Sequence, residues 1–301
     1  MTTVDMPAGR TTEHLAGTPV PGAAPPRRGR RAARTGWFSR RRMLILASQL
    51  VLLALILVVW EFGTGQTGQS GKFLDEYTVS KPSAIWEALK GFEQNGELWS
   101  NLLVSYRITL VGFAIGAVAG FLMGIVLGSI RYLADVLSPF LGALYSTPRL
   151  ALVPLFLLWF GIGDGANLAL VSSIVFFLVF YATFAGMKEV DAQVIARMKL
   201  MRAGRFSIYQ KAILPSAASF IVEGLRVSGP FALVSAVTAE MFSSNRGMGY
   251  LLIRSSTQFD TAGVFACIVV LMIMGILLMG AIRLLESRLL RWKPERIGRE
   301  R

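Results

Sequence analysis

Cysteine and histidine are nearly absent from this chain, which contains one of each, Cys267 and His14. A single cysteine cannot close a disulfide within the chain, and one cysteine with one histidine cannot build a zinc site or a histidine-based catalytic centre. Charged residues are also scarce, at 16% against about 25% in soluble domains. The sequence therefore predicts no catalytic residues and no metal ligands, and it argues against a soluble protein.

Long apolar runs occupy much of the chain, and 53% of its residues are hydrophobic. About 20 consecutive apolar residues are enough to span the hydrocarbon core of a bilayer. Runs of this kind predict an all-α membrane protein with six transmembrane helices, at 43–60, 103–130, 137–160, 166–187, 216–242 and 262–285.

The formal net charge of +13 has two interpretations, nucleic-acid binding or arginines beside membrane helices. The positions of the charges favour the second. Residues 1–42 contain nine arginines and two acids, residues 61–102 are mainly acidic, and residues 188–211 are basic again. Because cytoplasmic flanks are enriched in Lys and Arg, both termini are predicted to be cytoplasmic, with contacts to lipid headgroups and none to nucleic acid.

These biases divide the chain into five parts. They are a disordered basic cytoplasmic tail at 1–42, a first transmembrane helix at 43–60, an external segment at 61–102, a membrane core at 103–290 with a cytoplasmic loop at 188–215, and a basic cytoplasmic tail at 291–301.

Glycine recurs at every fourth position from Gly112 to Gly128 in the second predicted helix. This spacing leaves one helix face without side chains, so that another helix can approach closely. The partner helix is expected within the same subunit, with a contact between subunits as the alternative.

A polar break lies inside the third predicted helix, which contains Pro139, Pro148 and Pro154. Broken helices persist in a membrane only where protein or a water-filled cavity satisfies the freed backbone groups. The break therefore predicts a pathway lining, and the alternative is that Arg149 snorkels while the prolines shape packing. The candidates for the translocation pathway are Tyr145, Ser146, Thr147 and Pro148 at this break, and Ser235, Thr238 and Glu240 in the fifth helix.

Glu240 has an alternative role, a polar contact with Arg246 or Arg254 at the external surface. Glu223 and Arg226 are three residues apart in the same helix and are expected to pair with each other.

Residues 188–215 interrupt the membrane pattern with mixed apolar and basic residues. Their spacing predicts short amphipathic helices broken around Ala203 and Gly204, with Pro215 starting the fifth membrane helix. Such an exposed segment either lies on the lipid surface or docks into a groove of another protein.

This segment resembles the cytoplasmic coupling loop of binding-protein-dependent ABC importer permeases. Ala212-Ile213-Leu214-Pro215 is similar to the Ile/Val-x-Leu-Pro ending of that loop, and Val190-Asp191 is similar to its lead-in. Further similarities to the nitrate, sulfonate and taurine branch lie at Val79–Trp86, Pro148–Gly163, Gly224–Arg226, Ala239–Met241 and Gly247–Leu251.

The coupling loop departs from the family pattern at two places. Ala196-Arg197-Met198 stands where the family has Glu-Ala-Ala, and Arg202 stands where it has Gly. An arginine is costly there if the φ angle is positive. The loop is therefore expected either to bend differently or to belong to a subunit that pairs with a second, related permease.

The resemblance implies a type I ABC importer permease fold. It also implies that the loop transmits movement from an ATPase, with Asp191, Ala196, Arg197, Met198, Lys199, Arg202, Ala203, Gly204, Arg205 and Phe206 as the coupling residues.

The implied partners are ABC ATPase subunits, a solute-binding protein and a second permease, either another copy or a related chain. Because the chain has no G-x-x-x-x-G-K-[ST] motif, ATP and magnesium are expected on the separate ATPase, and this chain is expected to bind no cofactor. The solute is expected to be small, for example an anion such as a sulfonate, taurine or nitrate. The alternatives are an ion-coupled secondary transporter, a membrane enzyme and a membrane scaffold.

Overall fold

The structure is a computed structural model that describes residues 35–65 and 74–289. The predicted tail at 291–301 and most of the one at 1–42 lie outside the described residues. The chain divides into two units, residues 1–54 and 55–301, and each is considered by itself.

The first long helix is α1 (Thr35–Gly63), and its part from Met43 to Gly63 is long and apolar enough to cross a membrane. The helix begins before the predicted start at residue 43. Three arginines, Arg40 to Arg42, ended the apolar pattern in the sequence, but arginine is a good helix former and does not end the helix itself.

Short elements follow between α1 and the next long helix. Strand β1 (Thr64–Gly65) pairs in parallel with β2 (Leu74–Asp75), with Thr64 opposite Leu74. Helices α2 (Glu76–Val79) and α3 (Pro82–Gln94) come next. Proline is favourable in the first turn of α3, where its missing N–H has no helical partner to lose.

Five further segments are long and apolar enough to cross a membrane, if a bent pair is counted as one. They are α4 (Glu97–Ser129), the pair formed by α5 (Arg131–Ser146) and α6 (Val153–Phe160) with the 3-10 helix η1 (Arg149–Leu152) between them, α7 (Asp164–Lys188), α10 (Leu214–Ser243) and α12 (Thr261–Leu289).

The glycine stripe of α4 packs against α7 in the same chain. A Cβ atom added to Gly112 would lie 2.7 Å from Val171, one added to Gly124 would lie 2.6 Å from Thr183, and Gly128 lies against Met187. This confirms the prediction of close packing within one subunit. Because residue numbers rise together along both helices, α4 and α7 run parallel.

The parallel arrangement of α4 and α7 determines whether the bent pair of α5 and α6 crosses the membrane. If α4 and α7 run in the same direction, the segment between them must return the chain from one end of α4 to the other. The pair formed by α5 and α6 therefore crosses the full layer, although its two halves meet at 86°. The third helix was predicted at 137–160 with a break, and the chain leaves helical geometry at Thr147 and Pro148, within the predicted polar segment. The span begins earlier than predicted, at Arg131.

The remaining spans alternate in direction. Gly186 lies against Phe220 and Gly224 against Ala182, so α10 is antiparallel to α7. Gly229 lies against Ile282 and Leu233 against Gly275, so α12 is antiparallel to α10. With α1, the chain has the six predicted spans.

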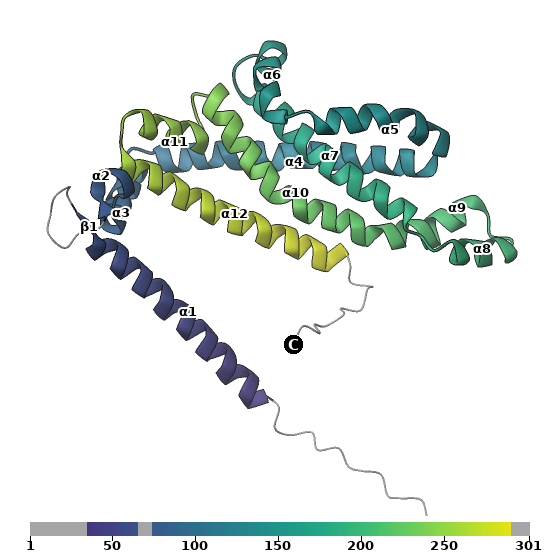
Figure 1. Ribbon diagram of the computed structural model, residues 1–301, viewed down its shortest axis with the longest axis horizontal. Coiled ribbons are helices and arrows are strands. Elements are labelled where there is room, and N and C mark those ends of the chain that lie inside the picture. Colours follow the sequence, from purple (N-terminus) through teal and green to yellow (C-terminus); the bar gives the residue numbers. More distant parts are fainter. Residues whose placement is uncertain (1–34, 66–73, 290–301) are drawn as a thin grey trace, which may run out of the picture. The chain divides into compact units, whose positions relative to one another are not determined.

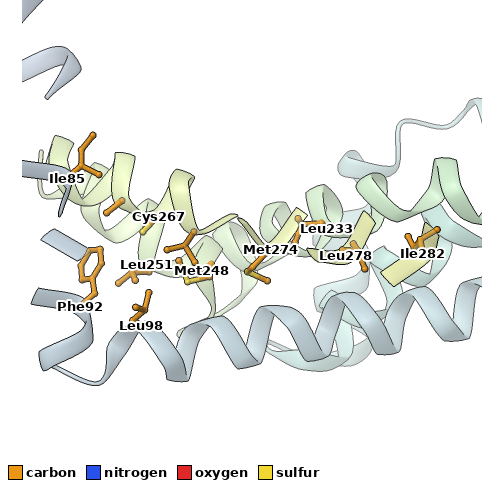
Figure 2. Close-up of a cluster of buried hydrophobic side chains, with 12 residues drawn as sticks. Ile85, Phe92, Leu98, Leu233, Met248, Leu251, Cys267, Met274, Leu278 and Ile282 are labelled. Atoms are coloured by element: carbon orange, nitrogen blue, oxygen red, sulfur yellow. The ribbon is translucent and has the colours of Figure 1, made fainter. Parts of the chain in front are cut away.

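One buried core joins five helices and extends from Ile85 in α3 along α12 to Ile282 (Figure 2). Helix α11 (Met248–Thr257) contributes Met248 and Leu251, which are fully buried between α4 and α12. Figure 1 shows α2, α3 and α11 at one end of the long helices and α8 (Ala192–Leu200) and α9 (Arg205–Ile208) at the opposite end. The acidic flanks are at the first end and the basic loop is at the second, as the charge bias predicts.

Candidate coupling segment and translocation pathway

Helix α8 forms the first half of the predicted coupling loop. Asp191 caps its N-terminus by accepting a hydrogen bond from the Gln193 N–H at 2.8 Å. At its C-terminus the Ala203 N–H donates to the Met198 carbonyl at 3.0 Å and the Arg202 N–H donates to the Lys199 carbonyl at 2.9 Å. This pair of hydrogen bonds is a Schellman motif, which turns the chain sharply after the helix.

Arg202 occupies the position of that motif at which glycine is usual. Its φ angle is +56°, in the left-handed region. A residue with a Cβ atom is destabilised there by roughly 1–2 kcal/mol. The turn after α8 therefore has the left-handed geometry that suits the family's glycine, and Arg202 adopts it under strain.

Large apolar side chains lie around the turn between α8 and α9, and we call them the apolar tip. Leu200, Met201 and Phe206 are 84%, 82% and 78% exposed. The basic residues Arg197 and Arg205 lie beside them in sequence. Of the other predicted coupling residues, Ala196, Lys199 and Gly204 are exposed, and Met198 and Ala203 are half-buried. Large apolar side chains gathered at an exposed tip are typical of a surface that another protein covers.

The return path from the tip passes through a π-helix, η2 (Tyr209–Ile213), which leads directly into α10. The Tyr209 hydroxyl donates a hydrogen bond to the Ser129 carbonyl at the end of α4, at 3.3 Å. Ile208 and Ala212 are buried here. The segment is therefore attached to α4 as well as to α7 and α10.

The polar break in the third span collects four of the pathway candidates. Tyr145 and Ser146 end α5, and Thr147 and Pro148 form the link to η1. The Ser146 and Thr147 hydroxyls donate to carbonyls four residues earlier, at 2.9 and 3.1 Å. Ser146 and Pro148 are exposed, and Thr147 is half-buried.

The other three candidates lie in α10 and differ in exposure. Ser235 and Glu240 are buried, whereas Thr238 is half-buried. The structure thus forms two separate groups of candidates, one on each of two spans. Their role in a pathway stays a prediction.

Glu240 belongs to a buried polar cluster at the external end. One carboxylate oxygen accepts hydrogen bonds from the Ser105 hydroxyl at 2.6 Å and the Gly249 N–H at 2.9 Å. Ser105 also accepts from the Met248 N–H, and Asn101 accepts from the Gly247 N–H, both at 2.7 Å. These contacts fasten the start of α11 to α4, with the carboxylate at the helix N-terminus, where negative charge is favourable.

Of the two arginines expected as alternative partners of Glu240, Arg246 and Arg254, the second has another partner. Arg254 donates two hydrogen bonds to Glu97, at 2.5 and 2.7 Å. These hydrogen bonds raise the pKa of the Arg254 guanidinium above its usual value. Elsewhere, Arg226 pairs with Glu223 at 3.9 Å, as predicted.

Three polar residues of the external end were not predicted from the sequence. Asn101 and Ser105 are four residues apart in an otherwise apolar helix, and that spacing was a usable signal for a shared face. Asn167 gave no such signal, because its contact with Ser243 joins residues far apart in sequence.

Metal ligation has no support in the part of the chain that the structure describes. No group of three or more His, Cys, Asp or Glu side chains lies close enough together there to hold a metal ion.

Known proteins are similar to this chain both in sequence and in fold. The chain is 32% identical over 81% of its length to the putative aliphatic sulfonates transport permease protein SsuC of Bacillus subtilis, of which it covers 87%. It is 30% identical over 80% of its length to the formylaminopyrimidine transport permease protein ThiX of Halalkalibacterium halodurans, of which it covers 94%. A solved amino acid ABC transporter shares the fold, with a TM-score of 0.55 at 18% identity over 66% of this chain and 97% of that one.

The family comparison agrees with these relatives. Residues 116–291 match the family described as the binding-protein-dependent transport system inner membrane component. The match extends from the middle of α4 past the end of α12, and so includes the coupling segment and the polar break. The chain therefore belongs to this family, as a multi-pass inner-membrane permease of the ABC importer class with the type I fold.

Proposed function

We propose that this permease imports a small anion that carries a sulfonate or similar oxyanion group. The solute is delivered by a binding protein, and ATP is hydrolysed with magnesium on a separate ATPase chain. Relatives named for aliphatic sulfonates and for taurine support the solute class. The relative named for formylaminopyrimidine is the alternative to test.

The observation that carries the ATPase assignment is the apolar tip formed by Leu200, Met201 and Phe206. A tip of this kind fits a groove on a partner protein, and the neighbouring arginines suit an acidic rim around that groove. The alternative is that the tip lies on lipid, and the purification described below distinguishes the two.

The coupling segment connects the ATPase-docking tip to the ends of two spans. It leaves α7 at Lys188 and enters α10 through η2, and both spans pack against α4. A shift of the docked tip would therefore move the ends of the spans together. Binding of ATP by the partner would favour one arrangement of the spans and its release the other.

The division of the chain follows from this role. The core at 103–290 forms the pathway together with a second permease, either another copy or a related chain. The segment at 61–102 faces the binding protein. Because Arg202 adopts the left-handed turn that suits the family's glycine, a second permease with the standard loop is not required to explain this substitution.

The test is affinity purification of the tagged chain from gently solubilised native membranes, followed by quantitative mass spectrometry. We expect an ATPase at about one copy per permease. Replacing Phe206 with Ser should release the ATPase while the permease stays folded.

The matched control is Phe259→Ser, since Phe259 is 74% exposed but lies at the external end. It should leave the ATPase bound. Recovery of the unaltered chain without any ATPase would contradict the proposal and favour an ion-coupled secondary transporter.

A further inference from the structure

Arg149 is a charged side chain at membrane depth without an acidic partner. The four ion pairs formed by the described residues involve Lys81, Arg107, Arg226 and Arg254, and none involves Arg149. Its Nε atom is buried and has no hydrogen-bond partner. An unpaired cation within a membrane span is costly and marks a functional position.

Aromatic rings hold the guanidinium in place. Its carbon lies 5.0 Å from the centre of the Tyr145 ring and 4.6 Å from that of Phe177. The Tyr145 ring in turn packs edge-on against Tyr181, with centres 4.8 Å apart. One guanidinium N–H also reaches the Tyr145 carbonyl at 3.4 Å, next to the exposed Ser146. We call these residues, with Arg149, the arginine cage.

The depth of the arginine cage excludes a lipid headgroup as its anion. Phe177 lies near the midpoint of α7, so roughly 15–20 Å of helix separates it from either end. An arginine side chain cannot snorkel over that distance. The expected alternative, a snorkelling Arg149, therefore does not fit its position beside Phe177.

The chemistry of the cage suits a brief contact with an oxyanion. A guanidinium presents a planar fork of donors that matches carboxylate, sulfonate or phosphate oxygens. Rings compensate its charge only partly, whereas a carboxylate would compete with the solute. A transport site must bind well enough to admit the solute and weakly enough to release it.

We propose that Arg149 contacts the anionic group of the solute as it passes the bend between α5 and η1. This inference rests on the proposed import of an anion and names the residue that meets the charge. The rings of Tyr145, Phe177 and Tyr181 position the guanidinium beside Ser146, on the exposed side of the break.

The test uses the purified complex in lipid nanodiscs and two thiol reagents of opposite charge. The native cysteine is buried and is replaced by C267S, and a reporter cysteine is introduced as S146C. The probes are 2-sulfonatoethyl methanethiosulfonate, itself an alkanesulfonate, and its trimethylammonium counterpart. The ratio of their rates is divided by the same ratio for free cysteine in solution.

We expect the corrected ratio to favour the sulfonate at Ser146→Cys and to fall about tenfold when Arg149→Gln is added, as expected for removal of one nearby charge. Arg149→Lys should keep most of the preference. The matched control is Arg226→Gln, an exposed membrane arginine with its own glutamate, which should leave the ratio unchanged. An equal ratio with and without Arg149 would overturn the proposal.

A reference cysteine keeps the test decisive if Arg149→Gln fails to assemble. Thr238→Cys, in the other group of pathway candidates, should show no preference for the sulfonate, and the same ratio at both cysteines would overturn the proposal. Uptake of labelled methanesulfonate by the unaltered complex tests the solute separately. Its absence contradicts the proposed solute, whereas the labelling ratio alone decides the role of Arg149.

Discussion

At the scale of single residues, the strained turn at Arg202 shows how a substitution can keep its backbone geometry. The motif at the end of α8 requires a left-handed residue, and both of its hydrogen bonds form with arginine in that place. The cost is local, because the exposed side chain clashes with nothing. The left-handed conformation at this position is the one that suits the family's glycine.

Replacing Arg202 with Gly should stabilise the permease. We expect the free energy of unfolding to rise by about 0.5–1 kcal/mol, since relief of the left-handed strain exceeds the extra entropy of glycine in the unfolded chain. Thermal unfolding in detergent, followed by tryptophan fluorescence, measures the effect.

The control for this change is Ala203→Gly, the neighbouring residue, whose φ angle is not positive. Glycine there only adds unfolded-state entropy and should lower stability. Equal effects of the two substitutions would mean that the turn at Arg202 is not strained.

Glu240 illustrates a residue whose interpretation changes with its surroundings. From the sequence it is an ionisable group inside a span, which indicates a pathway or a gate. In the structure it is fully buried and holds α11 against α4 through Ser105 and Gly249. Glu240 therefore helps to fix the position of α11, and its place in the pathway stays a prediction.

At the scale of helices, the contact between α4 and α7 is set by glycine. A Cβ atom added to Gly120 would collide with the backbone carbonyl of Phe176 and lie 3.0 Å from the Phe180 nitrogen. Backbone atoms cannot rotate away as the end of a flexible side chain can.

We therefore expect Gly120→Ala to lower the free energy of unfolding by about 1–3 kcal/mol, the usual range for overpacking. The loss should appear as a lower thermal midpoint of the purified permease. Gly280→Ala is the matched control, because a Cβ atom added to Gly280 in α12 meets nothing within 4 Å. That change should be neutral or stabilising by up to about 1 kcal/mol through helix propensity.

At the scale of the whole molecule, the direction of α7 determines the number of crossings. Two equally exposed residues flank the bent pair, Tyr132 at the start of α5 and Ile162 after α6. In a C267S background, Ile162→Cys should react with an impermeant maleimide added to intact cells. Tyr132→Cys should react only after the membrane is opened.

Labelling of both cysteines from the same side would show that the bent pair enters and leaves on one side. The parallel packing of α4 and α7 would then be wrong. A cysteine at the exposed external residue Gln94 serves as the positive control for labelling of intact cells.

Apolar runs and flanking charges were sufficient to predict six spans and the basic loop between α7 and α10. They could not predict the break at Pro148 as a right-angled bend, because proline permits a kink without setting its angle. They also missed η2, since a π-helix depends on tertiary packing around Tyr209 rather than on a local pattern.

The candidate site, too, could be predicted only in part from the sequence. The spacing in the coupling segment predicted two short helices with a turn between them, and the resemblance pointed to a special position at Arg202. The arginine cage could not be predicted, because Phe177 reaches Arg149, and Tyr181 reaches Tyr145, only after α5 folds back along α7.

The glycine stripe has a mechanical consequence. Helices that touch backbone to backbone along several turns cannot slide or roll past each other without collisions, so α4 and α7 form one rigid unit. Helices separated by side chains can shift by small rearrangements of those side chains. When the permease changes conformation, α4 and α7 must therefore tilt together as a rigid body. The link between α5 and η1, where Arg149 lies, is the place at which the chain can bend during this movement.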